Sequence, residues 1–98
     1  MRFAKQIGDG YEESPFKELR LQFGASVSKW ALALGVGERD VQDVESGRKK
    51  KPSESYRRAL YEIIGADRYG EVLTLYERWH VGLAKRVREE VLARRDGR

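Results

Sequence analysis

Apolar residues recur at helical spacing along most of the chain, and glycine or proline residues separate the periodic segments. Ser14 followed by Pro15 is a typical helix start, because serine caps the helix and proline tolerates the first helical position. An apolar stripe at i, i+3 and i+7 follows, formed by Phe16, Leu19 and Phe23. The pattern therefore predicts a first helix that begins after Ser14 and ends at Gly24.

Two short helices are predicted next. Ser26 can cap the second helix, and Gly35 can end it in the left-handed conformation. Its inner positions are Trp30, Ala31 and Leu34. The third helix spans residues 38–46 and stops at Gly47; its only apolar residues are Val41 and Val44. Most of its surface must therefore face solvent or a partner.

The second half of the chain predicts two more helices and contains no strand pattern. A fourth helix runs from Glu54 to Ile64 and closes at Gly65, with an inner face of Tyr56, Leu60, Ile63 and Ile64. A fifth helix, from about Asp67 to Arg94, has apolar residues every three or four positions: Val72, Tyr76, Trp79, Leu83, Val87 and Val91. We expect an all-α fold of five helices with a long C-terminal helix.

Length and composition are typical of one globular domain. The 98 residues are 40% hydrophobic and 37% charged, which suits a single domain over residues 1–98 with a modest core. Residues 1–13 lack periodicity and predict an arm. The N-terminus has no apolar signal region, and no apolar run approaches the ~20 residues of a spanning helix. We therefore expect a cytoplasmic protein without membrane association.

The chain offers few groups for catalysis or metal binding. It has no cysteine, which removes disulfides, thiolate nucleophiles and cysteine-based zinc sites. Its one histidine, His80, cannot form a metal site alone, and its helical surroundings favour a packing or surface role. We expect no enzyme activity and no cofactor. The net charge of +4 agrees with a polyanionic partner without establishing one.

An ordered set of residues between Phe16 and Gly65 gives the most specific signal. The set is Phe16-Lys-Glu-Leu-Arg20, Gly24-x-Ser26, Trp30-Ala31, Leu34-Gly35-Val36, Val41, Val44-Glu45-Ser-Gly47, Lys51-Pro52-Ser53 and Gly65. In these residues the chain resembles the helix-turn-helix domain of lambdoid phage repressors and the related Xre family. The resemblance implies a lambda-repressor-like core over residues 14–65, followed by the C-terminal helix over 67–94. It also implies that Arg20 and Glu45 form a buried ion pair.

The resemblance further implies which residues contact double-stranded DNA. The third helix would enter the major groove and present the base-reading set Glu38, Arg39, Gln42 and Asp43. Arg39 suits guanine, Gln42 suits adenine, and a carboxylate such as Glu38 suits cytosine. Backbone contacts would come from the start of the second helix and from the basic loop: Ser26, Ser28, Lys29, Arg48, Lys49, Lys50 and Lys51.

Two features depart from this family pattern. Val27 stands where the family usually has glutamine, and the third helix places Glu38, Asp40 and Asp43 against a single arginine, Arg39. One possibility is that the basic loop outweighs the repulsion between these acidic residues and DNA. The other is that this surface binds a protein and that the affinity for DNA has been lost. The first hypothesis makes the chain a sequence-specific transcriptional regulator, most simply a repressor. The alternative is an antitoxin-like or accessory protein-interaction module with a toxin-like partner.

The distal part of the C-terminal helix predicts self-association. A helix from about Asp67 to Arg94 is longer than the small domain to which it belongs. Its last apolar residues, Leu83, Val87 and Val91, would lie exposed in a monomer. We therefore expect a homodimer in which these residues meet their symmetry mates.

Overall fold

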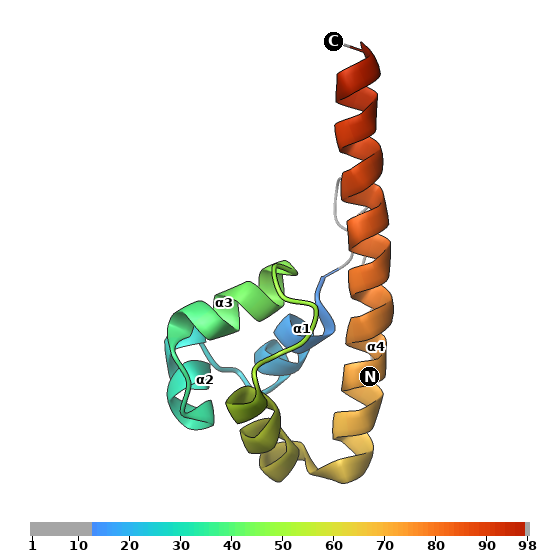
Figure 1. Ribbon diagram of the computed structural model, residues 1–98. Helices are drawn as coiled ribbons and strands as arrows, with labels where there is room; N and C mark the ends of the chain where they lie inside the picture. The colour runs from blue at the N-terminus through green and yellow to red at the C-terminus, as the bar shows by residue number, and fades with distance from the viewer. Residues whose placement is uncertain (1–12, 98) are drawn as a thin grey trace.

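The computed structural model describes residues 13–97 and contains four helices: α1 (Pro15–Gln22), α2 (Val27–Leu34), α3 (Glu38–Ser46) and α4 (Glu54–Gly97). No strand occurs among these residues, so the all-α class is confirmed for this part of the chain. Helices α1–α3 and the start of α4 form a globule, and the rest of α4 rises along one side and projects beyond it (Figure 1). The predicted arm over residues 1–13 lies, except for Glu13, outside the described residues.

The short helices begin and end at the residues that their local chemistry predicts. The Ser14 hydroxyl accepts a hydrogen bond from the Phe16 amide at 3.3 Å, with Pro15 at the first helical position. The Ser26 hydroxyl accepts one from the Lys29 amide at 3.2 Å. Gly35 ends α2 with φ of 72°, a left-handed conformation that glycine adopts without a side-chain penalty.

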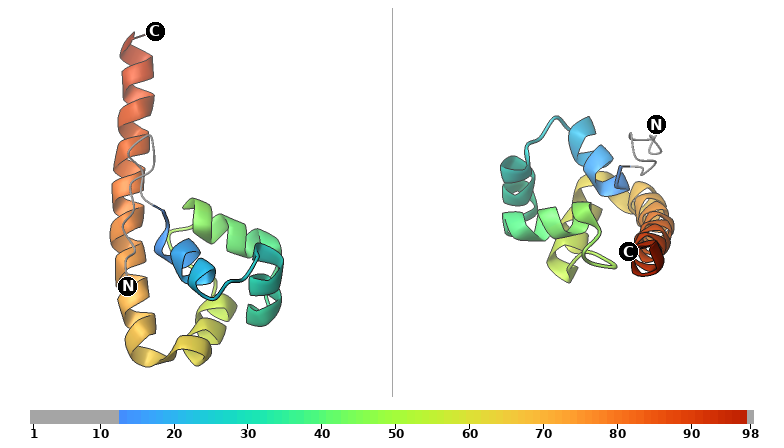
Figure 2. Two further views of the ribbon diagram at one scale, coloured as in Figure 1. Left: turned by 180° about the vertical axis from the view of Figure 1, so that it is seen from behind. Right: turned by 90° about the horizontal axis from the view of Figure 1, so that it is seen from above.

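The fourth and fifth predicted helices form the single element α4, which differs from the expected count of five. Gly65 interrupts its helical geometry, with φ of 85° and ψ of 167°, and the helix resumes directly afterwards. Figure 2 shows the resulting bend, from a first segment beneath the globule to a long second segment beside it. Because glycine reaches this backbone conformation easily, the chain reverses here without a separate loop. The second segment continues to Gly97, three residues beyond the predicted Arg94.

The core lies where α4 packs against the three shorter helices. Its buried residues are Phe16, Leu19, Trp30, Ala31, Leu34, Val41, Val44, Tyr56, Leu60, Val72 and Tyr76. The ring of Phe16 lies between two tyrosines of α4, with centroids 5.7 Å from Tyr56 and 4.8 Å from Tyr76. Aromatic pairs at these distances add stabilisation beyond simple area burial. The two segments of α4 are thereby joined through α1.

Two residues predicted to lie inside are exposed. Phe23 is 47% exposed at the end of α1, where its ring rests against Trp30 at 5.4 Å. Ile63 is 41% exposed because the core side of this segment follows the spacing Tyr56, Leu60 and Ile64. Ile63 lies beside that line. Within residues 13–97, no helix combines the length and apolar character that a membrane crossing requires.

Candidate nucleic-acid interface

Helix α3 lies on the core through Val41 and Val44 and turns its polar residues outward. Both valines are fully buried, and a three-residue turn, residues 35–37, joins α3 to α2. On the outer face, a hollow is lined by Arg39, Gln42, Asp43, Ser46 and Arg48. The structure thus brings together three members of the predicted base-reading set with Arg48 of the loop. It does not include the fourth member, Glu38, in the lining of this hollow.

The structure also brings together Arg20 and Glu45, the pair that the family resemblance implied. Arg20 donates from Nε to Glu45 Oε2 at 2.7 Å and from a terminal nitrogen to Oε1 at 3.0 Å. Its other terminal nitrogen donates to the Ala25 carbonyl at 2.8 Å. The two side chains are only 8% and 9% exposed. The hydrogen bonds to Glu45 raise the pKa of Arg20 against the opposing effect of burial, so the pair links α1 to α3 as ions.

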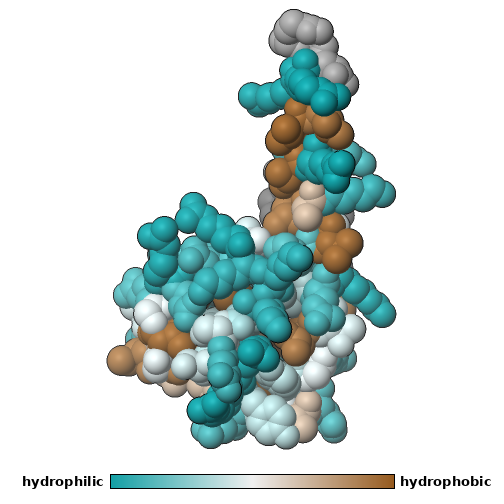
Figure 3. All heavy atoms as spheres, viewed as in Figure 1, coloured by the Kyte–Doolittle hydropathy of each residue, from teal (hydrophilic) through white to brown (hydrophobic). Residues whose placement is uncertain are grey.

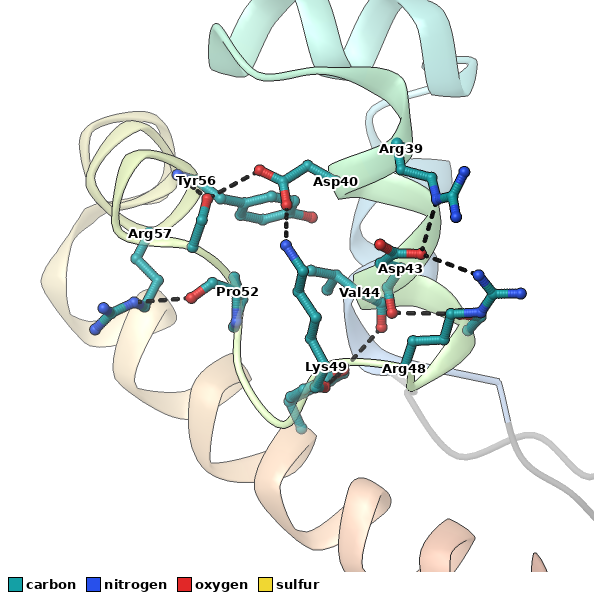
Figure 4. Close-up of polar contacts among 12 residues, drawn as sticks. Arg39, Asp40, Asp43, Val44, Arg48, Lys49, Pro52, Tyr56 and Arg57 are labelled. Atoms are coloured by element: carbon teal, nitrogen blue, oxygen red, sulfur yellow. Dashed lines mark hydrogen bonds and ion pairs between the residues drawn. The ribbon is translucent and has the colours of Figure 1, made fainter.

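Asp40 is held away from the outer face by a basic residue of the loop and by the cap of α4. Lys49 Nζ lies 2.5 Å from one of its carboxylate oxygens, and Ser53 donates to the other at 3.0 Å (Figure 4). The hydrogen bond from Lys49 is the main cause of the lowered pKa of Asp40. Ser53 also accepts from the Tyr56 amide at 3.3 Å. The carboxylate of Asp40 is therefore neutralised within the protein.

This contact corrects the role expected for Lys49. The sequence predicted it as a phosphate-binding residue, but its ammonium group turns back to Asp40 because a carboxylate lies within reach of its long side chain. Lys50 and Lys51 instead lie exposed on the loop. Asp40 and Ser53 were not predicted as part of the site. The only signal in the sequence was the opposite charge of Asp40 and the basic loop.

Asp43 of α3 also has partners within the protein. Asp43 lies between two guanidinium groups, 3.6 Å from Arg39 and 3.8 Å from Arg48 (Figure 4). Both arginines are well exposed, at 77% and 67%, whereas Asp43 is 18% exposed. Asp43 is thus placed to orient the two arginines, which differs from the base-reading role expected for it.

A polar contact joins the start of α2 to the start of α3. Ser28 donates from its hydroxyl to Glu38 at 2.7 Å. Ser26, Ser28 and Lys29 are exposed, as phosphate contacts require, although the Ser26 hydroxyl already caps the helix. Glu38 is exposed at the start of α3.

Most of the net positive charge lies away from α3. Residues 84–95 of α4 carry five basic side chains and two acidic ones: Lys85, Arg86, Arg88, Arg94 and Arg95 against Glu89 and Glu90. This segment supplies a net +3 of the total +4. The overall charge is therefore not by itself an argument that α3 faces a polyanion.

No protein-family model, curated protein or solved structure matches the chain.

Helix α4 contacts the end of α3 and the loop that follows it. The Tyr76 hydroxyl lies 2.8 Å from the Val44 carbonyl and 2.7 Å from the Lys49 carbonyl. His80 Nε2 lies 2.8 Å from the Gly47 carbonyl, so the tautomer with a proton on Nε2 donates to it. The packing role expected for His80 thus includes a polar contact. The apolar spacing predicted Tyr76 only as an inner residue.

Leu83 differs from the expectation that it is available to a partner chain. It is half-buried, and a Cβ atom added at Gly47 would collide with its side chain and lie 3.1 Å from the Trp79 ring. Leu83 therefore packs against the end of α3 within the same molecule. Val87 and Val91 remain 43% and 61% exposed on the projecting part of α4.

Proposed function

We propose that this chain is a sequence-specific DNA-binding transcriptional regulator, a repressor that acts by occupying DNA and not by catalysis. Helices α2 and α3 form its helix-turn-helix, of the lambda-repressor and Xre type, with α3 as the recognition helix. The short glycine-containing turn between them suits this motif. We expect a protein with this function to act in the cytoplasm.

One observation carries the proposal. Of the three acidic residues of α3 that would repel DNA, two are engaged by basic side chains of the protein: Asp40 by Lys49, and Asp43 by Arg39 and Arg48. Glu38 remains exposed and accepts a hydrogen bond from Ser28. The outer face then presents two exposed guanidinium groups and Gln42, and Lys50 and Lys51 are exposed on the loop that follows α3. Arg39 is the candidate for bidentate contact with guanine, and Gln42 for contact with adenine. Arg48, Lys50 and Lys51 are the candidates for phosphate contacts.

The test separates phosphate contacts from base contacts. The triple variant Arg48→Ala, Lys50→Ala, Lys51→Ala should bind all duplexes more weakly, because three cationic side chains no longer reach phosphates. Its plot of log affinity against log salt should flatten by about one unit for each phosphate that the loop no longer binds. Arg39→Ala should instead relax preference at one base position of a site selected from random DNA. Gel shifts over a salt series measure the first effect, and sequencing of selected DNA measures the second.

Arg58→Ala is the control for loss of an exposed cation outside the loop, since Arg58 pairs with Glu54 on the first turns of α4. It should leave the salt dependence unchanged. A triple variant that binds as tightly as the parent at every salt concentration would show that the loop does not contact phosphates. A parent that binds no duplex at low salt would refute DNA binding itself.

We further propose that the regulator is a homodimer whose two copies contact each other through the projecting part of α4. Figure 3 shows apolar side chains along this segment. Val87 and Val91 are exposed there, at 43% and 61%. These residues continue the row of Leu83 at intervals of four, along one side of the helix. Their exposure leaves apolar area that a second copy can bury, at ~25 cal/mol per Å².

The double variant Val87→Glu, Val91→Glu should therefore shift the protein from twice 11.3 kDa to 11.3 kDa in sedimentation equilibrium. Leu92→Glu is the matched control, because Leu92 is also exposed but points away from the row of Val87. It should leave the dimer intact. A parent that is monomeric at micromolar concentration, or a control that dissociates equally, would contradict this interface.

The net +3 of residues 84–95 favours a second candidate function, an antitoxin-like or accessory module. In that case the projecting helix would bind an acidic, toxin-like protein through its apolar row and basic flanks, the helix-in-groove mode of recognition. The parent would then be monomeric and would bind DNA weakly or not at all. The sedimentation and gel-shift experiments therefore distinguish the two functions.

A further inference from the structure

The loop between α3 and α4 carries the proposed phosphate contacts, and its residues Arg48, Lys50 and Lys51 are exposed. Where these side chains lie depends on what holds the loop backbone. Near the two ends of the loop, the Arg48 amide donates to the Asp43 carbonyl at 3.0 Å and Arg57 Nε donates to the Pro52 carbonyl at 3.2 Å. Two further contacts, both from the second segment of α4, hold the end of α3 and the middle of the loop.

The first contact is the hydroxyl of Tyr76. It lies within hydrogen-bonding distance of two carbonyls, Val44 in the last turns of α3 and Lys49 in the loop. One hydroxyl proton serves both acceptors, so the group joins the end of the recognition helix to the middle of the basic loop. Tyr76 itself cannot shift, because it is fully buried and its ring packs on Phe16 at 4.8 Å. Burial raises the pKa of Tyr76, which keeps the hydroxyl protonated as a donor.

The second contact lies one helical turn further along α4. His80 Nε2 is 2.8 Å from the carbonyl of Gly47, the residue that ends α3. Trp79 and Leu83 pack against the same glycine. Tyr76 and His80 thus hold the backbone at three successive points, residues 44, 47 and 49.

We infer that Tyr76 and His80 are positioning residues for DNA binding: they hold the basic loop in the place where its side chains meet phosphates. This inference rests on the proposed function and adds a role for α4, which contacts no base. Removal of the Tyr76 hydroxyl leaves the charge of the loop unchanged. It releases the Lys49 carbonyl, so the loop samples more positions and its side chains bind phosphates for less of the time.

Tyr76→Phe tests this role, and Tyr56→Phe is its matched control. Tyr56 is equally buried, and its hydroxyl accepts a hydrogen bond from Trp30 Nε1 at 3.3 Å, whereas the Tyr76 hydroxyl lies against a loop carbonyl. Each variant removes a buried hydroxyl that is hydrogen-bonded, so both should lower Tm by about 4–8 °C. Only Tyr76→Phe should flatten the salt dependence of DNA binding, by about one unit of slope. Base preference should be unchanged in both.

His80→Leu provides a second variant, since it removes the hydrogen bond to Gly47 at a half-buried position. It should flatten the slope in the same direction as Tyr76→Phe. If the parent binds DNA with a steep salt dependence and both variants keep that slope, the positioning role is overturned while the proposed function stands. A change of slope in Tyr56→Phe equal to that in Tyr76→Phe would also overturn it. Failure of the parent to bind any duplex refutes the proposed function instead.

Discussion

Arg20→Met should destabilise the protein by about 3–5 kcal/mol, the effect typical of removing one member of a buried ion pair. Glu45 would be left without its cationic partner at a site only 9% exposed, and the Ala25 carbonyl would lose its donor. Small domains are stable by only ~5–15 kcal/mol, so this change removes a large fraction of the total. Urea denaturation followed by circular dichroism measures the difference in the free energy of unfolding.

Arg58→Met is the control for the removal of an arginine. Arg58 and Glu54 form an ion pair at 2.8 Å, comparable in length to that of Arg20, but both side chains are at least 70% exposed. Exposed pairs contribute ~0–1 kcal/mol, because water and salt screen them. The two variants should therefore differ by several-fold in their effect. Equal destabilisation, or an Arg20→Met protein as stable as the parent, would contradict the importance of burial for this pair.

Gly47→Ala should destabilise the protein by about 2–5 kcal/mol, the sum of two separate costs. Gly47 has φ of 86°, a left-handed conformation that costs a residue with a side chain ~1–2 kcal/mol. The added methyl group would also be forced against Leu83 and Trp79, and overpacking of this kind costs ~1–3 kcal/mol. Thermal unfolding of the variant measures the sum.

Gly35→Ala isolates the first source. Gly35 also ends a helix with positive φ, 72°, but a Cβ atom there would meet nothing within 4 Å. It should cost ~1–2 kcal/mol, the conformational penalty alone. If both variants are destabilised equally, the packing of α4 against the end of α3 does not restrict this position.

The sequence predicted the helices well because their boundaries depend on local chemistry. Ser14 and Ser26 cap helices with their own hydroxyls, and Gly35 ends α2 through its own backbone freedom. These interactions involve residues at most a few positions apart, so spacing along the chain is enough to predict them. Most of the buried face followed from the same periodicity. Phe23 and Ile63 did not, because exposure depends on which side of a helix its neighbours cover.

The character of the proposed DNA-binding surface was decided by tertiary structure alone. From the sequence, Asp40 counted as a charge that repels DNA and Lys49 as one that attracts it; in the fold they pair with each other. The Tyr76 hydroxyl reaches carbonyls 27 and 32 residues away, and Leu83 packs on Gly47 instead of lying free. Helical spacing gives the side on which a residue lies, but it does not give the atom that the residue meets. That depends on how α4 bends at Gly65 and passes the end of α3, which is a property of the packed chain as a whole.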